Sequence, residues 1–207
     1  MSTLSEQEQL WILQARQGDQ QAFARIVQAY QRPVFNLAYR MLGSAEAAED
    51  AAQETFMRAY VRLDSYDPSF KFASWILSIA SHHCIDCLRK SKGREVSLEQ
   101  VDGGRWIPDS SLTPEDRAMR TEQRHAVREQ LERLPVQYRL VVVLRYWYDM
   151  SYNEIARITE STESAIKSRL HRARLMMAGL LTEAELVEPT GTAKERRLSK
   201  SAVSNSI

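Results

Sequence analysis

The side chains best suited to chemistry in this 207-residue sequence are the basic and hydroxyl-bearing side chains of segment 164–174. Ile166, Leu170, Ala173 and Met177 follow steps of four, three and four, which predicts one apolar stripe along a helix. Basic and hydroxyl groups then share the opposite side, where they could contact base edges and phosphates together. The candidate contact residues are Ser164, Lys167, Ser168, His171 and Arg172, with Arg169 at the flank.

The residues before this segment predict how it is positioned. Ser151 and Glu154 have the spacing of a capping box, in which each side chain binds a free backbone N–H of the other residue. A short helix is expected over 152–158, a turn over 159–161, and a second helix over 162 to about 181. Two helices joined by a three-residue turn, the second rich in Lys and Arg, are typical of a DNA-binding helix-turn-helix.

A second cluster with chemical potential is His82-His83-Cys84, followed by Cys87. Cys84 and Cys87, at positions i and i+3, could share a zinc ion with His83. Structural zinc sites usually add a second pair of ligands, and the other two histidines lie in the second half of the chain. We therefore expect two free thiols and no metal site.

No motif for catalysis accompanies these groups. The sequence has neither a phosphate-binding Gly-rich loop nor an HExxH pair. Its acidic residues fall on expected helix surfaces or in an expected linker. We expect no enzymatic activity and no cofactor.

The composition favours helices throughout the chain. Only 7 Gly and 6 Pro are present, which argues against turn-rich sandwiches. Apolar residues between 10 and 42 recur at steps of three and four, with breaks expected at Gly18-Asp19 and at Pro33. Gly43 is expected to end this stretch, and further helices are expected over 44–63 and 72–90. The expected fold class is all-α, with two small helical domains joined by a flexible linker.

The domain limits follow from where the helical pattern stops. Residues 91–113 contain Gly, Pro, Ser and Asp without a helical period, which is typical of a linker. Helices resume over 114–133, and another begins at Pro135. The last residues have too few apolar side chains to offset the entropy of ordering. The expected division is a first domain at 1–92, a linker at 93–117, a helix-turn-helix domain at 118–181 and a disordered tail at 182–207.

The charge of the chain is concentrated in the second domain. The net charge is only +1, yet residues 118–180 carry 11 basic and 7 acidic side chains. No apolar run approaches the roughly 18 residues that a membrane span requires, and the amino terminus lacks the pattern of a signal peptide. We expect a cytoplasmic protein that does not insert into membranes and whose second domain binds a polyanion.

Six short motifs carry a resemblance to a known family: DAAQETF at 50–56, FASWI at 72–76, IDCLR at 85–89, LPVQYR at 134–139, SYNEIA at 151–156 and SAIKSRLHRAR at 164–174. The first three resemble region 2 of the sigma-70 family, and the last three resemble region 4. With only these two domains, the chain is most similar to the ECF (extracytoplasmic function) sigma factors. The resemblance implies a dissociable subunit of bacterial RNA polymerase that directs promoter-specific transcription initiation.

The resemblance also implies that the first domain recognises and melts the minus-ten promoter element. Melting needs a place for an unstacked base and a positive surface that follows the backbone. At Ser81-His82 the chain departs from its relatives, many of which carry Arg-Asn there. The residues assigned to this role are Tyr66, Phe70, Lys71, Trp75, His82, Asp86, Arg89 and Lys90.

The helix expected over 44–63 has an apolar side and a polar side. The residues expected to face the core are Ala48, Ala52, Phe56, Ala59 and Leu63. The resemblance implies that the polar side binds the clamp coiled coil in the largest subunit of core RNA polymerase. The residues of that contact are Asp50, Gln53, Glu54 and Met57.

The second domain is expected, by the same resemblance, to read the minus-thirty-five element with its last helix. The other expected partner is an anti-sigma factor. The alternative is a conventional helix-turn-helix regulator that acts without core polymerase. That alternative explains residues 135–178 but not the first domain.

Overall fold

The structure is a computed structural model that describes residues 2–91 and 127–187. Every regular element in these two ranges is a helix, and none is a strand. The expected all-α fold class is therefore confirmed. In the described ranges no helix is both long enough and apolar enough to cross a membrane.

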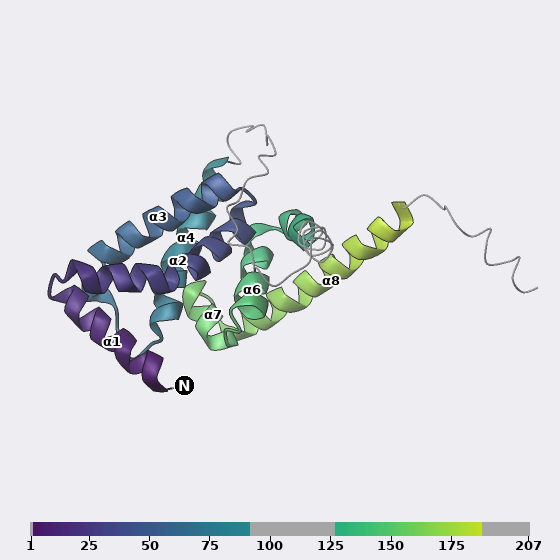
Figure 1. Cartoon of the computed structure of the whole chain (residues 1–207). Coiled ribbons are helices and arrows are strands. Elements are labelled where there is room, and N and C mark those ends of the chain that lie inside the picture. The colour runs from purple at the N-terminus through teal and green to yellow at the C-terminus, as the bar shows by residue number, and fades with distance from the viewer. Residues whose placement is uncertain (1, 92–126, 188–207) are drawn as a thin grey trace, which may run out of the picture.

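The first helical unit has four α-helices and one short 3₁₀ turn. Helices α2, α3 and α4 pack on one another, and α1 covers one end of α2 (Figure 1). The bounds are α1 Ser2–Arg16, α2 Gln20–Leu42, α3 Ala45–Val61, η1 Leu63–Ser65 and α4 Phe72–Ser91.

Capping residues fix the ends of these helices. The Asp19 carboxylate accepts hydrogen bonds from the backbone N–H groups of Gln21 and Ala22, which starts α2. Gly43 ends α2 with φ at 78°, a left-handed conformation that suits glycine. The Ser44 hydroxyl accepts from the N–H of Ala47 and starts α3.

Pro33 does not break the helix, contrary to expectation, and α2 continues through it to Leu42. The missing N–H and the crowding of the proline ring cost a helix interior about 3 kcal/mol. Val34 and Leu37, just beyond the proline, are both 0% exposed in the core. Most helical stability comes from burying an apolar face, so this packing outweighs the local penalty.

The buried side of α3 also differs from expectation by about one position. Ala51 and Thr55 are buried, whereas Ala52 and Phe56 are only half-buried. Thr55 can enter the core because its hydroxyl donates a hydrogen bond to the Ala51 carbonyl at 2.6 Å. The expected core positions Ala48, Ala59 and Leu63 are buried.

The described part of the second helical unit begins with a helical segment at 127–133, and helices α6, α7 and α8 follow it. Its core includes Leu131, Leu140, Leu144, Ile155 and Ile166, each at most 2% exposed. The labelled helices are α6 Val136–Trp147, α7 Tyr152–Ile158 and α8 Glu163–Val187.

Helix α8 is longer than expected. It runs to Val187, six residues past the expected end, and its later turns project from the body of the chain (Figure 1). The segment 182–187, expected to be disordered, is therefore helical. The expected linker, the start of the helix at 114 and the rest of the tail lie outside the described residues.

The two units pack against each other through α2 and α4 on one side and α6 and α7 on the other. Arg139 of α6 is buried, and its guanidinium donates to the Met41 carbonyl at 2.5 Å. The Tyr148 hydroxyl donates to the Pro33 carbonyl at 2.6 Å. Two carbonyls in the second half of α2 thus accept hydrogen bonds from the second unit.

Candidate nucleic-acid interface

The helix-turn-helix begins with the capping box that the sequence predicts. The Ser151 hydroxyl accepts from the Glu154 N–H at 3.2 Å, and the Glu154 carboxylate accepts from the Ser151 N–H at 2.8 Å. After α7, Glu160 adopts φ 48°, and the Ser161 N–H donates to the Ala156 carbonyl at 2.8 Å. Thr162 then caps α8 by accepting from the Ala165 N–H. These bonds fix how α8 leaves the turn.

Helix α8 divides into a buried side and an exposed side as predicted. Ile166, Leu170 and Ala173 are buried against the second unit. The side chain of Arg169 is half-buried at the boundary. The candidate contact residues on the exposed side are Ser164, Lys167, Ser168, His171 and Arg172. This side presents hydroxyl, imidazole and cationic groups at once, which suits a helix in a DNA major groove.

Tyr152 is a candidate contact residue that sequence reasoning missed. Two cations lie near its ring, with the Arg145 guanidinium 5.7 Å and the Lys167 ammonium 5.8 Å from the ring centroid. This aromatic bridge connects α6, α7 and α8. Two basic residues and one aromatic on successive predicted helices were the available signal, but only the fold brings them together.

The aromatic residues of the first unit do not all face solvent. Tyr66 is buried, its hydroxyl donates to the Phe70 carbonyl at 2.6 Å, and its ring centroid lies 5.1 Å from that of Phe72. Trp75 is half-buried, 5.2 Å from Phe72 between ring centroids. Phe70 is 42% exposed. Of the three aromatic candidates, Phe70 therefore offers the most accessible ring.

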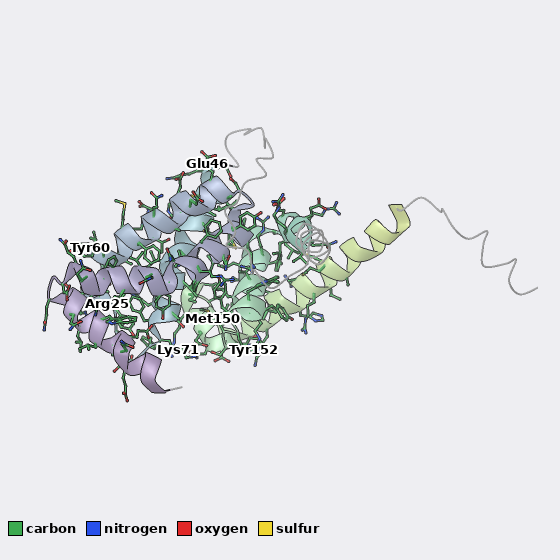
Figure 2. The ribbon with its side chains drawn as sticks, in the orientation of Figure 1. Arg25, Glu46, Tyr60, Lys71, Met150 and Tyr152 are labelled. Atoms are coloured by element: carbon green, nitrogen blue, oxygen red, sulfur yellow. The ribbon has the colours of Figure 1, made fainter. Side chains whose placement is uncertain are left out.

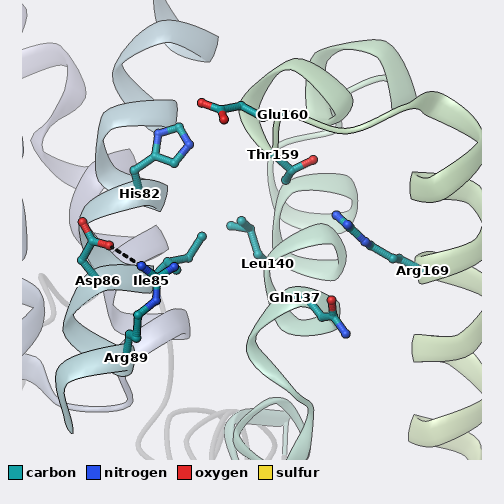
Figure 3. Close-up of a pocket in the computed structure, with 9 residues that line it drawn as sticks. All are labelled: His82, Ile85, Asp86, Arg89, Gln137, Leu140, Thr159, Glu160 and Arg169. Atoms are coloured by element: carbon teal, nitrogen blue, oxygen red, sulfur yellow. Dashed lines mark ion pairs between the residues drawn. The ribbon is translucent and has the colours of Figure 1, made fainter. Parts of the chain in front are cut away.

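The polar candidates of α4 lie along its exposed side. The set comprises His82, Asp86, Arg89 and Lys90. Asp86 and Arg89 form an exposed ion pair at 3.6 Å. His82, Asp86 and Arg89 line a groove of about 330 Å³ whose opposite wall includes Arg169 and Glu160 (Figure 3). Candidate residues from both units therefore border one groove.

Lys71 lies at the junction of the two units (Figure 2). Its ammonium forms an ion pair with the Glu154 carboxylate at 3.0 Å. The Ser74 hydroxyl donates to the same carboxylate at 3.3 Å. The Arg157 guanidinium lies 4.3 Å from the ring centroid of Phe70. The loop before α4 is thus engaged by α7.

The candidate polymerase contacts lie on the outer side of α3. Asp50 and Gln53 are exposed, and Met57 is 65% exposed. Glu54 is half-buried and accepts a hydrogen bond from the Arg58 guanidinium at 2.6 Å. The surface therefore offers one free carboxylate, one amide and one apolar side chain beside a paired carboxylate.

Cys84 and Cys87 are free thiols on α4, and both are at least partly covered by packing. Cys84 is buried, and burial raises the pKa of its thiol to about 12. Cys87 is half-buried with its sulfur 3.4 Å from Nε2 of His83. Across 2–91 and 127–187, no three His, Cys, Asp or Glu residues gather as a metal site would require.

Comparison with known proteins gives matches over both units. The sigma-70 region 2 model matches residues 26–94, and the sigma-70 region 4 model matches residues 124–177. The chain is 38% identical over 169 residues to the ECF RNA polymerase sigma factor SigW of Bacillus subtilis (strain 168), covering 79% of this chain and 90% of SigW. It is 32% identical over 181 residues to the ECF RNA polymerase sigma-E factor of Escherichia coli (strain K12), covering 83% and 93% of the two chains.

A solved structure shares the fold. The sigma factor RpoE of Bartonella quintana, crystallised with the anti-sigma factor NepR, aligns with a TM-score of 0.61 and 23% identity. The alignment covers 77% of this chain and 96% of RpoE. At this identity the match describes the fold alone.

Proposed function

The chain belongs to the sigma-70 family and is an ECF-type RNA polymerase sigma factor, and from this premise we propose which residues make its contacts. Its relatives are sigma factors, which are regulators of transcription initiation rather than enzymes. The chemistry of RNA synthesis belongs to the polymerase, so the task of this chain is binding. The protein would act in the cytoplasm, where the polymerase works.

We assign the exposed side of α3 to core polymerase. Asp50, Gln53, Glu54 and Met57 together provide negative charge, an amide and an apolar side chain on adjacent turns. Such a surface is complementary to a basic helical partner, for which the clamp coiled coil of the largest subunit is our candidate. The Glu54–Arg58 pair holds one carboxylate in a fixed position on this surface.

We assign the loop before α4 and the exposed side of α4 to the minus-ten element. Phe70 supplies an accessible ring for an unstacked base, and Lys71, Arg89 and Lys90 supply positive charge for the backbone. His82 and Asp86 could hydrogen-bond to exposed bases. Tyr66 and Trp75 would contribute indirectly. Their rings pack with Phe72 and so support the conformation of the loop before α4.

We assign the exposed side of α8 to the minus-thirty-five element. The single observation that supports this most strongly is the separation of its buried stripe from its basic and hydroxyl face, on a helix held by a capped helix-turn-helix. Lys167 and Arg172 are the proposed base readers, whereas Arg169 is the proposed phosphate contact.

We propose domain limits close to those expected from the sequence. The first domain would span 1–92, the linker 93–117 and the second domain 118–181, extended by the last turns of α8 to Val187. We also propose an anti-sigma factor as a partner. A related fold has been crystallised with one, in the complex of RpoE with NepR.

Reconstituted transcription tests the function. Core polymerase with this protein should start transcripts at a specific promoter, and core polymerase alone should not. The alternative, a helix-turn-helix regulator, would bind its operator without core polymerase and would add no promoter-specific initiation. The match of residues 26–94 to region 2 disfavours this alternative.

A further inference from the structure

We propose that Arg16 is a positioning residue for recognition of the minus-ten element. It would hold the loop before α4, residues 66–71, so that the Phe70 ring is presented to an unstacked base. Arg16 is the last residue of α1 and is not among the residues assigned to DNA. The inference rests on the proposed function, because that function assigns Phe70 and Lys71 to DNA. Arg16 would therefore act on DNA through the loop and not by direct contact.

The Arg16 guanidinium binds the backbone where α3 ends and the loop begins. Its Nε donates to the Leu63 carbonyl at 3.2 Å, and its Nη2 donates to the carbonyls of Asp64 and Tyr66, each at 2.7 Å. These three carbonyls belong to η1 and to the residue directly after it. One planar group thus joins the end of α1 to a segment 47 to 50 positions further along the chain.

The backbone, and not the Asp64 carboxylate, is the main target of Arg16. That carboxylate lies 3.9 Å from Arg16 Nε and its side chain is 90% exposed, so an ion pair here contributes little. The Arg16 side chain is only 24% exposed, and hydrogen bonds to carbonyls strengthen where water is excluded. A guanidinium holds several N–H donors in one plane, whereas lysine has a single nitrogen on a flexible stem. The arrangement therefore requires arginine and not merely a cation.

Tyr66 connects the backbone that Arg16 holds to Phe70. The Tyr66 carbonyl accepts from Arg16, and the Tyr66 hydroxyl donates to the Phe70 carbonyl at 2.6 Å. The turn between them is closed by the Phe70 N–H, which donates to the Asp67 carbonyl at 3.1 Å, and by the Ser69 N–H, which donates to the Asp67 carboxylate at 2.9 Å. A displacement of Tyr66 would therefore move the exposed ring of Phe70.

A second set of contacts joins α1 to Tyr66. The Glu8 carboxylate accepts a hydrogen bond from the Tyr30 hydroxyl. The Tyr30 ring centroid lies 5.3 Å from that of Phe72, which in turn lies 5.1 Å from that of Tyr66. Both ring pairs are edge-to-face, the arrangement that aromatic quadrupoles favour. The same helix thus supports Tyr66 through its backbone, by way of Arg16, and through its ring.

Hydrogen exchange in the full free chain tests whether Arg16 holds the loop. In Arg16→Ala, the amides of Tyr66 and Phe70 lose the fixed backbone on which their hydrogen bonds depend. Exchange over 63–71 should rise about tenfold while α4 stays protected, since the loss of a hydrogen bond promotes local opening. Arg25→Ala, which removes the same side chain from an exposed position of α2, should leave this exchange unchanged. Unchanged exchange over 63–71 in Arg16→Ala would overturn the proposal.

Binding of the assembled polymerase to two DNA probes tests the consequence. Both probes come from a promoter that the reconstituted polymerase uses. One is single-stranded DNA with the minus-ten element, and the other is a duplex with only the minus-thirty-five element. Arg16→Ala and Arg16→Lys should each weaken binding of the single strand about fivefold, the lower end of what one base–aromatic stack contributes, and leave the duplex unchanged. Asp64→Asn, which keeps all three carbonyls, should change neither.

Three results of the probe experiment would overturn the proposal. Normal binding of the single strand by Arg16→Lys would mean that only the charge matters. Equal losses for both probes would mean that Arg16 supports the fold as a whole. A loss in Asp64→Asn as large as that in Arg16→Ala would mean that the ion pair, and not the backbone contact, holds the loop.

A double-mutant cycle tests whether Arg16 acts through Phe70. In a Phe70→Ala background, Arg16→Lys should weaken binding of the single strand much less than it does alone, because the ring that Arg16 positions is gone. A residue needed only for folding would cost the same in both backgrounds. Additive losses would therefore overturn the proposal. Far-UV circular dichroism checks that each variant keeps its helices.

These measurements separate the role of Arg16 from the proposed function. Hydrogen exchange needs neither polymerase nor DNA. If the unsubstituted protein with core polymerase fails to bind the single strand, the proposed function fails, and so does the role of Arg16 in DNA recognition. If that binding is intact while Arg16→Ala leaves exchange over 63–71 unchanged, the proposed function stands and the positioning role fails.

Discussion

The carboxylate of Glu154 lies 3.0 Å from the ammonium of Lys71 while it also accepts the hydrogen bonds that start its own helix. One side chain therefore belongs to the capping box of α7 and to the contact between the two helical units. The two roles use different oxygens, Oε2 for Ser151 and Oε1 for Lys71. Loss of the charge at this position should affect both the local helix and the packing of the units.

The ionisation of Glu154 should make part of the stability depend on pH. Burial opposes the charged form, but the Ser151 N–H, the Lys71 ammonium and the Ser151 hydroxyl outweigh it and lower the pKa of Glu154 from 4.5 to about 2. A pKa lower in the folded than in the unfolded chain means that the charged form stabilises the fold above pH 4.5. That contribution disappears as the pH falls through about 2.

Urea unfolding of the unsubstituted chain and of Glu154→Gln would measure this contribution. The difference in free energy of unfolding should be largest above pH 4.5 and should shrink steadily toward pH 2. A difference that stays constant over that range would show that Glu154 acts through packing and not through its charge.

The hydroxyl of Ser151 should contribute as an N-cap. Removing an N-cap hydroxyl typically costs about 0.5–2 kcal/mol, so Ser151→Ala should lower the free energy of unfolding by that amount. Ser161→Ala is a matched control in the same motif, because Ser161 contributes to the turn through its backbone N–H. Equal destabilisation by the two substitutions, in the same unfolding assay, would contradict the role of the cap.

Local signals in the sequence predicted the parts of the fold that short-range physics determines. The Ser151 and Glu154 spacing predicted the start of α7, and Gly43 predicted the end of α2. The step pattern of Ile166, Leu170 and Ala173 predicted which side of α8 is buried. Each of these signals involves residues within a few positions of one another, so no knowledge of the tertiary fold was needed.

Predictions that depended on tertiary packing were less accurate. Pro33 was expected to break a helix, yet the buried residues after it keep α2 continuous. Ala52 and Phe56 were expected to face the core but are half-buried, and Thr55 is buried instead because its hydroxyl bonds to its own helix. The contact between Lys71 and Glu154 has no periodic signature, since it depends on how two separately patterned units meet.

Reversal of charge on α3 should abolish assembly with core polymerase. Asp50→Lys with Glu54→Lys replaces the negative charges of the proposed contact with positive ones, and like charges across an interface cost several kcal/mol. Co-elution with core polymerase on a sizing column measures the loss, and far-UV circular dichroism checks that the helices remain.

A control for that variant is available on the same helix. Glu46→Lys with Glu49→Lys makes the same change in net charge on exposed positions closer to the start of α3. Co-elution should survive in this control. If the Asp50 and Glu54 variant still co-elutes with core polymerase, the assignment of the α3 surface is wrong.

Tyr152 should support promoter binding through its ring rather than its hydroxyl. The ring contacts both Arg145 and Lys167, and each cation–π contact at an exposed site contributes about 0.5–1 kcal/mol. Tyr152→Phe should therefore leave the affinity of the assembled polymerase for its promoter nearly unchanged, whereas Tyr152→Ala should weaken it several-fold. The same loss in both variants would point to a role for the hydroxyl instead.

Arg172 and Arg169 should differ in what they read. Arg172 is exposed on the face of α8 that we assign to the major groove, where its planar guanidinium could bind O6 and N7 of guanine together. Arg172→Ala should cost about 1–3 kcal/mol at the cognate promoter and relax selectivity at one or two base pairs. Arg169, half-buried at the flank, should act on phosphate, so Arg169→Ala should weaken all promoters nearly equally.

Transcription from a library of single-base minus-thirty-five variants distinguishes the two roles. With Arg172→Ala, the ranking of promoters should change only where the base contacted by Arg172 varies, because the other contacts on α8 remain. With Arg169→Ala, the ranking should match that of the unsubstituted protein at a lower overall level, since a phosphate contact carries no base information. If Arg172→Ala keeps the original ranking at every position, Arg172 contacts phosphate or packs against its neighbours, and the proposed orientation of α8 in the groove is incorrect.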